Sequence, residues 1–210
     1  MIHLFTTALV TLLVIVDPPG CAPIFASLTA GTTAGHRRMM AFRSAAIAWS
    51  ILMFFALLGK PLLDTLGITL ASFRLAGGIM LFIIALEMVF EKRTQRREHR
   101  ASEIVASPEA EDISVFPMAI PMIAGPGSIA SIMLLVGRAN GPVETLVVLG
   151  AMTAVILLTL VALLAAGPLM KLIGAKLEAM ITRILGVILA ALAAQFVIDG
   201  IRQGLPGLAH

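Results

Sequence analysis

The sequence is poor in several residue types on which soluble and secreted proteins depend. It has a single cysteine, Cys21, no tyrosine and one tryptophan, and only 13% of its residues are charged. One cysteine excludes a disulfide within the chain and a cysteine-based metal centre. Soluble globular domains are about 25% charged, so the scarcity of charge excludes that class as well.

Aliphatic residues make up the difference. Of the 210 residues, 59% are hydrophobic, only 5% are aromatic, and the mean hydropathy is +1.02. Six apolar stretches are long enough to cross a bilayer, since about 20 apolar residues span its hydrocarbon core. They are residues 2–29, 41–59, 72–90, 114–137, 143–166 and 179–201. The sequence therefore predicts an all-α integral membrane protein with six transmembrane helices in a lipid bilayer.

The basic residues are distributed unequally between the two sides of the predicted bundle. Eleven of the fifteen lysines and arginines lie on the side of the first, third and fifth loops, and the other four are Lys60, Arg74, Arg138 and Arg202. Because cytoplasmic loops collect positive charge, we expect the larger group to face the cytoplasm and both termini to be external. Short basic runs between apolar segments are typical of membrane topology, so we expect no binding of nucleic acid.

Proline and glycine interrupt the first and fourth spans. The interruptions are Asp17-Pro18-Pro19-Gly20 with Pro23, and Pro117, Pro121 and Gly125-Pro126-Gly127. Proline removes a backbone donor and clashes with the preceding turn, so we expect helices 1 and 4 to be broken. Irregular backbone at membrane depth is tolerated where protein or a water-filled cavity satisfies it, which makes both breaks candidate sites. The alternative is a pair of proline kinks without a function.

The two halves of the chain resemble each other. A shift of 107 positions aligns Asp17–Cys21 with Ala124–Ser128, and two further inserted residues align Arg74 with Arg183. The first repeat is residues 1–90 and the second is residues 113–210, joined by a charged cytoplasmic linker at 91–112. Three spans in each repeat force opposite orientations in the membrane. Such inverted repeats with broken helices are typical of secondary transporters.

Two motifs resemble those of a known family. Residues 16–25 read V-D-P-P-G-x-x-P-I-F, residues 119–129 read A-I-P-x-I-A-G-P-G-S-I, and spans three and six begin with R-x-x-G. Together they resemble the MarC family over nearly the whole chain. The resemblance implies a six-helix protein of the prokaryotic cytoplasmic membrane. The family name refers to an antibiotic-resistance locus, and some members are described as transporters of small neutral amino acids. Where the family usually has asparagine after the D-P-x-G glycine, this chain has Cys21.

The chemistry of a broken helix fits a small zwitterionic solute. The second half-helix presents amide donors and the positive end of its dipole, whereas the first half-helix presents carbonyls. The candidate donors are the amides of Gly20, Cys21 and Ala22, and those of Gly127, Ser128 and Ile129. The candidate acceptors are carbonyls near Val16 and Ile123. Gly20, Gly125 and Gly127 allow the backbone to approach the substrate closely.

Asp17 is the only acidic residue deep in an apolar span. A carboxylate there is costly unless it is paired or protonated, so it is a candidate for binding the substrate ammonium or for carrying a coupling proton. The alternative is structural, because aspartate before proline is a good helix cap. Arg74 and Arg183 recur at predicted helix starts, and interfacial anchoring is their favoured role.

An enzyme is not expected. The four histidines lie near span ends or in loops, so we expect no metal site, and Ser128 has no histidine or lysine near it in the sequence. Residues 125–130 match the G-x-G-x-x-A fingerprint, but no strand is predicted before them, so we expect no dinucleotide and no other cofactor.

The sequence thus predicts a secondary transporter of small solutes. Small neutral amino acids are the favoured substrates, and a proton is the candidate coupling ion. The alternatives are a drug or solute exporter linked to antibiotic resistance, and a membrane scaffold that transports nothing. A homo-oligomer is compatible with the sequence.

Overall fold

Every described element of the protein is helical. The computed structural model describes residues 1–90, 92 and 112–204, without the side chains of residues 169–176 and 178. The elements are α1 (Ile2–Val16), α2 (Pro18–Leu28), α3 (Ala34–Thr65), α4 (Leu70–Val89), η1 (Ser114–Ile123), α6 (Pro126–Val136), α7 (Pro142–Leu164) and α8 (Ala166–Gly204). The predicted linker at 91–112 lies outside the described residues, apart from its members Lys92 and Asp112.

The helices confirm the predicted class of an all-α membrane protein. Five helical runs in the described residues are long and apolar enough to cross a membrane, and the bent pair of η1 and α6 makes a sixth if it counts as one span. The runs extend beyond the apolar stretches, because hydropathy marks the part that lies in lipid and not the ends of a helix. Thr33, for example, caps the start of α3, with its side chain accepting a hydrogen bond from the His36 amide.

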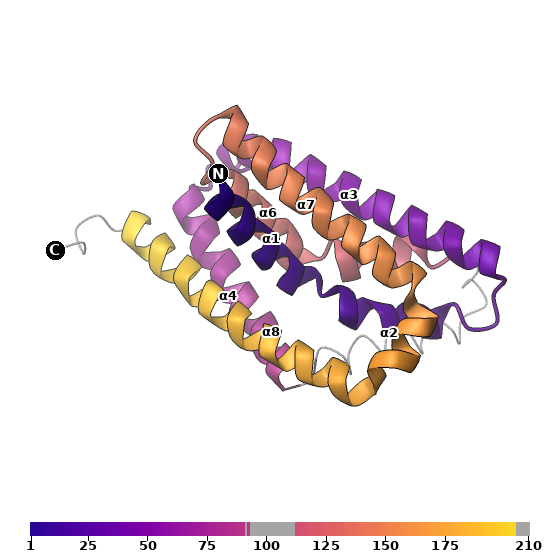
Figure 1. Cartoon of the computed structure of the whole chain (residues 1–210). Coiled ribbons are helices and arrows are strands. Elements are labelled where there is room, and N and C mark those ends of the chain that lie inside the picture. Colours follow the sequence, from indigo (N-terminus) through magenta and orange to yellow (C-terminus); the bar gives the residue numbers. More distant parts are fainter. Residues whose placement is uncertain (91, 93–111, 205–210) are drawn as a thin grey trace.

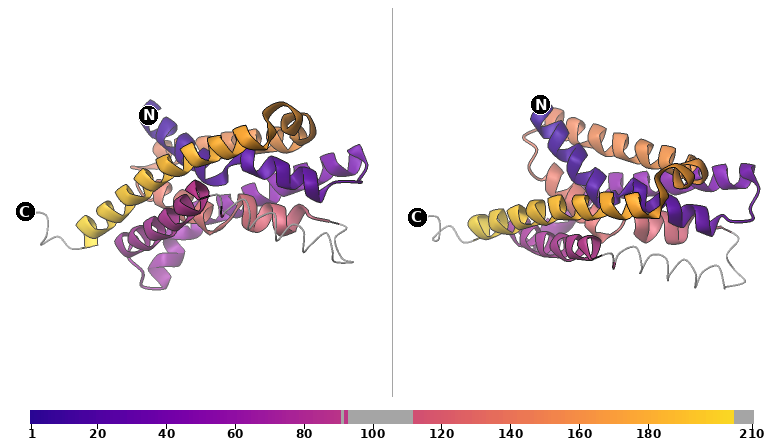
Figure 2. Two further views of the ribbon diagram at one scale, coloured as in Figure 1. Left: turned by 90° about the horizontal axis from the view of Figure 1, so that it is seen from below. Right: turned by 60° about the horizontal axis from the view of Figure 1, so that its bottom comes forward.

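The helices form two outer pairs around a central group (Figure 1). The pair α3 and α7 is tied across the two halves of the sequence by a hydrogen bond from Trp49 Nε1 to Thr153 Oγ1, 3.0 Å long. The pair α4 and α8 lies side by side along most of α4 (Figures 1 and 2). Between the pairs run α1 and α6, which contact helices on both sides.

Close packing of α4 against α8 depends on glycine. A Cβ atom added at Gly78 would lie 3.0 Å from the carbonyl oxygen of Ala193, and one added at Gly186 would lie 3.1 Å from that of Ala85. Such distances leave no room for a side chain between the two backbones. Close contact through small residues is the usual way in which helices associate in membranes, where the hydrophobic effect does not drive them together.

The interior of the bundle is formed by the two spans that contain the proline and glycine interruptions. In the first span 72% of the most apolar window is buried, against 28–39% in the other unbent spans. In α6, eight of eleven residues are buried. The remaining helices expose large apolar side chains such as Phe54 and Val161, which suits contact with lipid. Most residues of the interruptions are therefore surrounded by protein, although Pro126 is exposed.

The start of α1 and the end of α8 lie at the same end of the bundle, and the connection from α2 to α3 lies at the opposite end (Figures 1 and 2). This arrangement agrees with an even number of spans. Which end faces the cytoplasm stays a prediction from the charge distribution.

Candidate functional site

Local sequence explains why α1 ends where it does. Asp17 adopts φ 57° and ψ 65°, and it is the only non-glycine residue with a positive φ in the described part of the chain. A residue before proline is pushed out of the right-handed helical region, and aspartate tolerates the left-handed region better than most residues. Asp17 and Pro18 together therefore stop α1 at Val16, and α2 starts at Pro18.

The Asp17 side chain caps the second helix. It is 1% exposed, and its Oδ1 accepts a hydrogen bond from the Gly20 amide at 3.2 Å. A Cβ atom added at Gly20 would lie only 2.2 Å from Asp17 Oδ2. The capping carboxylate thus requires glycine at position 20. The group that closely approaches the Gly20 backbone is the Asp17 side chain. A role of Asp17 in coupling stays a prediction.

The second junction, between η1 and α6, has a different construction. Phe116 and Ile120 each precede a proline and have extended backbone angles inside η1, as expected for residues in that position. The chain then bends by 54° between η1 and α6. A Cβ atom added at Gly125 would lie 2.3 Å from the carbonyl oxygen of Pro121, so only glycine fits.

The two junctions differ in how the following helix begins. Asp17 caps α2, whereas Gly125 has no side chain with which to cap α6. The amides of Gly127 and Ser128 therefore lie in the first turn of a helix without a side-chain cap. Those amides and the helix dipole make this end electropositive.

A matching side-chain hydrogen bond occurs at both junctions. Cys21 Sγ donates to the Val16 carbonyl at 3.4 Å, and Ser128 Oγ donates to the Ile123 carbonyl at 2.7 Å. Both bonds reach back five residues, and both donors and both acceptors are separated by the same 107 positions. Each satisfies a carbonyl at the end of the preceding helical segment. Cys21 thus takes the same structural role as Ser128, although the family that the motifs resemble usually has asparagine at its position.

The predicted site residues are placed in the interior. Seven are buried and Ile129 is half-buried; the seven are Asp17, Gly20, Cys21, Ala22, Gly125, Gly127 and Ser128. Several of the predicted donors already have partners within the protein. The Cys21 amide donates to the Asp17 carbonyl and the Ile129 amide to the Gly125 carbonyl, both at 3.0 Å. The uncapped amides of Gly127 and Ser128 are therefore the stronger candidates for a ligand.

The start of α6 lies against the last turn of α1. A Cβ atom added at Gly127 would lie 3.4 Å from Ile15 Cγ2, 3.4 Å from Leu81 Cδ2 and 2.7 Å from Ile84 Cδ1. The two junctions thus meet in the interior, with α4 covering one side. The side chains closest to Gly127 are therefore aliphatic.

Comparison with known proteins identifies the lineage of this fold. A profile described as MarC family integral membrane protein matches residues 2–205. The chain belongs to the MarC family. It is 35% identical to a UPF0056 membrane protein of Methanocaldococcus jannaschii, over 96% of this chain and 97% of that protein. No solved structure matches the chain.

Two bacterial relatives of this MarC protein also match nearly its whole length. The UPF0056 membrane protein YvbG of Bacillus subtilis is 33% identical over 99% of this chain and 97% of its own length. The UPF0056 inner membrane protein YhgN of Escherichia coli is 32% identical over 96% of this chain and 98% of its own length. This protein is therefore a multi-pass membrane protein.

Sequence reasoning missed several polar residues in the MarC chain. The hydroxyls of Thr11, Ser44 and Ser131 are buried, and none has a hydrogen-bond partner among the described residues. Ser131 lies one turn after Ser128 on α6. An isolated hydroxyl residue in an apolar span was the only available signal, and that signal does not distinguish a buried hydroxyl from one that faces lipid.

The two repeat-related arginines do not have the same environment. Arg74 is 3% exposed, whereas Arg183 is exposed. The predicted anchoring role at an interface is therefore wrong for Arg74. Arg183 does not begin a helix either, since α8 starts at Ala166. The basic segment before the sixth span continues the helix, with Pro168 in the first turn, where proline is tolerated.

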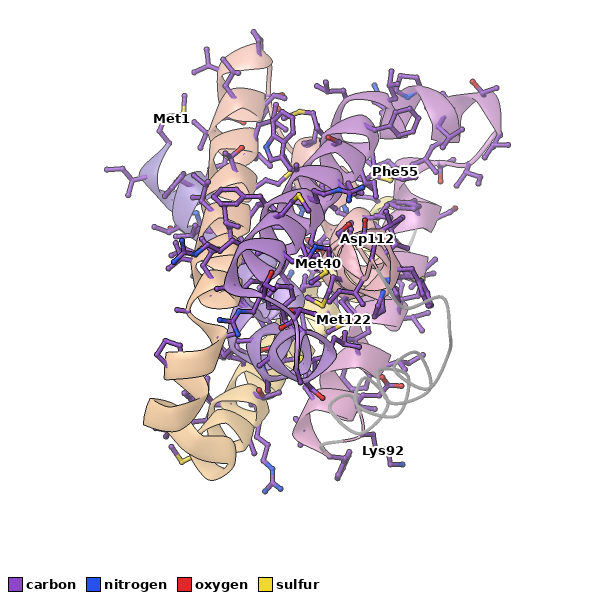
Figure 3. The ribbon with its side chains drawn as sticks, turned by 90° about the vertical axis from the view of Figure 1, so that its right-hand side faces the viewer. Met1, Met40, Phe55, Lys92, Asp112 and Met122 are labelled. Carbon is purple, nitrogen blue, oxygen red and sulfur yellow. The ribbon has the colours of Figure 1, made fainter. Side chains whose placement is uncertain are left out.

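An ion pair lies at the start of η1, at the end of the bundle away from Met1. Arg43 Nη1 on α3 donates to Asp112 Oδ2, and Asp112 Oδ1 accepts from the Ser114 hydroxyl and, at 2.9 Å, from the Ser114 amide. The hydrogen bond from the Ser114 hydroxyl, with help from the Arg43 charge, lowers the pKa of Asp112 below its ordinary value. Met40 of α3 and Met122 of η1 belong to one buried apolar cluster, and both are labelled together with Asp112 in Figure 3.

Proposed function

We propose that this MarC protein is a secondary transporter that carries small neutral amino acids across the cytoplasmic membrane. The observation that carries the proposal is the meeting of two interrupted spans in the buried centre of the bundle, where Gly127 of α6 contacts Ile15 of α1. Interrupted helices at the middle of a membrane protein are costly, and transporters use their free ends to bind substrate and coupling ions. A membrane scaffold has no need for them.

An inverted repeat is part of the proposal. The equivalent bonds of Cys21 and Ser128 support it, because two unrelated segments would have no reason to share both the donor position and the acceptor position. The pairing of α3 with α7 and of α4 with α8 supports it as well, since each pair joins corresponding spans of residues 1–90 and 113–210. Alternating access would follow from the movement of one repeat relative to the other.

The two junctions suit the two charges of a zwitterion. The uncapped start of α6 would bind the carboxylate through the amides of Gly127 and Ser128, because a helix N-terminus attracts anions. Asp17 would bind the ammonium group or, in the empty site, a coupling proton. The substrate would then bring no net charge into the protein interior.

The side chains around Gly127 favour a small substrate. Ile15, Leu81 and Ile84 approach the position of a Cβ atom there to within 3.4 Å, so a substrate that binds at Gly127 would have to be small and could not be an aromatic drug. Drug export would require a wide cavity with aromatic lining. We propose transport of solutes and not an enzymatic reaction, with no cofactor.

We also propose that the protein lies in the inner membrane with both termini external. The relative YhgN is named as an inner membrane protein, and the lysine and arginine distribution supports the orientation.

The proposal is tested by uptake of labelled glycine into proteoliposomes that contain the purified protein, with and without a pH gradient. We expect uptake above that of empty liposomes, and competition by unlabelled alanine. Propionate and ethylamine, which each carry only one of the two charged groups, are matched competitors and should compete poorly. Uptake equal to that of empty liposomes would refute the transporter proposal, and equal competition by propionate would refute zwitterion recognition.

A further inference from the structure

Arg74, near the start of α4, is a buried cation whose charge is not balanced by its surroundings. Arg74 is 3% exposed, and its Nε atom has no hydrogen-bond partner among the described residues. Burying a charged group without a partner is costly, so a favourable contact is expected for Arg74. The proposed transport function leaves this residue unexplained.

Two charged residues are close enough to act on Arg74 electrostatically. They are Arg138, in the connection from α6 to α7, and Asp199 on α8. Backbone packing fixes this arrangement, because a Cβ atom added at Gly200 would lie 2.8 Å from the Leu75 amide nitrogen. The residue after Asp199 is therefore pressed against the residue after Arg74.

Asp199 carries one negative charge, which cannot neutralise both Arg74 and Arg138, and both of its oxygens already have partners other than Arg74. Arg138 Nη2 pairs with Asp199 Oδ2, and Gln195 Nε2 donates to Asp199 Oδ1 at 2.7 Å. Arg138 is further held in place by Phe196, with its guanidinium carbon 4.8 Å from the ring centroid. The group of Arg74, Arg138 and Asp199 thus carries one excess positive charge.

No other described carboxylate supplies the missing charge. Glu144 Oε2 accepts a hydrogen bond from the Asn140 amide at 2.6 Å, and no ion pair joins Arg74 to an acidic residue in the part of the chain that the structure describes. Arg202, which lies exposed three positions after Asp199, adds to the positive charge at this end.

We propose that Arg74, Arg138, Gln195 and Asp199 form a binding site for one singly charged oxyanion. The Nε and a neighbouring Nη of a guanidinium present two parallel donors, which match the two oxygens of a carboxylate or a phosphodiester. One negative charge cancels the excess charge of the cluster. A carboxylate from solution and the phosphodiester of an anionic lipid share this chemistry.

The oxyanion site is separate from the proposed substrate site. Arg74 precedes Leu81 and Ile84, which contact Gly127, by about two to three turns of α4, or roughly 10–15 Å along the helix. The oxyanion site can therefore be tested without any assumption about transport.

The first arm of the test measures the Tm of the purified, delipidated protein in detergent as sodium acetate is added. We expect a saturable rise in Tm for the wild-type protein and none for Arg74→Gln. Arg202→Gln removes an exposed arginine at the same end of the bundle and should keep the rise. The second arm compares nanodiscs of phosphatidylcholine with nanodiscs that also contain phosphatidylglycerol. Stabilisation by phosphatidylglycerol that depends on Arg74 would identify a lipid as the source of the oxyanion.

Two further variants distinguish a binding site from a merely structural arginine. Asp199→Asn removes the internal counter-charge and should lower the half-saturating acetate concentration several-fold. Arg138→Gln frees Asp199 to pair with Arg74 and should abolish the response, although Arg74 is still present. If Arg74→Gln does not fold, these two variants still decide the question. A wild-type protein that responds to neither acetate nor phosphatidylglycerol, or an equal response in Arg74→Gln, would overturn the proposal.

Discussion

Asp17 combines a backbone role and a side-chain role at one position. Its left-handed conformation ends α1, and its carboxylate caps α2 through the Gly20 amide. The two roles depend on each other, because the turn brings the carboxylate to the face of Gly20 where a Cβ atom would otherwise lie. A single added carbon atom at Gly20 would therefore disturb the first junction.

Gly20→Ala should destabilise the protein by about 0.5–2 kcal/mol, the usual cost of losing a helix cap. The added methyl group cannot coexist with Asp17 Oδ2 at 2.2 Å, so the carboxylate must leave the capping position. Thermal unfolding of the detergent-solubilised protein measures the effect. Gly150→Ala is the matched control, because nothing lies within 4 Å of an added Cβ atom there. Equal Tm values for Gly20→Ala and the wild-type protein would show that the cap does not stabilise the fold.

Asp17→Asn should separate the cap from proton coupling. Asparagine tolerates the left-handed conformation and keeps an oxygen acceptor for the Gly20 amide, but it has no group to protonate. We expect a folded protein that exchanges glycine weakly and does not accumulate it in response to a pH gradient. Full accumulation by Asp17→Asn in proteoliposomes would show that the residue only caps the helix.

At the scale of elements, the helix ends that depend on local sequence could be predicted. Asp17-Pro18 sets the boundary of α1 and α2, and Gly125-Pro126 sets the start of α6, because proline and its preceding residue restrict the backbone without help from the rest of the fold. The first residue of α8 could not be predicted, because polar and basic segments form helices without an apolar signal. The bonds of Cys21 and Ser128 required the geometry of the turn, which the sequence does not provide.

The burial of Arg74 shows the same limit for tertiary contacts. The sequence places Arg74 and Arg183 at equivalent positions of the repeat, yet only Arg74 is buried. Arg74 lies beside the close contact of α8 with α4 at Gly200, which joins residues far apart in the chain. A pattern within one helix carries no information about such a partner.

Gly186→Leu should force α4 and α8 apart. The added side chain would meet the Ala85 carbonyl and the Cβ atom of Met88, 2.9 Å from the position of its own Cβ, which are rigid parts of the neighbouring helix. Overpacking of this kind costs about 1–3 kcal/mol. The predicted result is a lower Tm for Gly186→Leu and an unchanged Tm for Gly150→Leu. Equal Tm values for the two variants would contradict the close packing of α4 on α8.

At the scale of the whole molecule, the distribution of basic residues predicts an orientation in the membrane that can be tested. Alkaline phosphatase fused after His210 should be active, because it folds only outside the cytoplasm. A green fluorescent protein fused at the same position should be dark, since it does not mature after export in unfolded form. The opposite pattern would reverse the predicted orientation, and activity of both fusions would contradict a single topology.

The central claim is that the two interrupted spans form the substrate site, and exchange of labelled glycine across proteoliposomes containing Gly127→Val tests it most directly. The added side chain lies over the uncapped start of α6, where the substrate carboxylate is proposed to bind, and the flexible end of Ile84 can move to accommodate it. We predict that Gly127→Val folds and loses exchange by about tenfold or more, a typical cost of a misplaced methyl group in a binding pocket. Gly150→Val, with open space around it, should exchange at the wild-type rate. Wild-type exchange by a folded Gly127→Val protein would contradict the account.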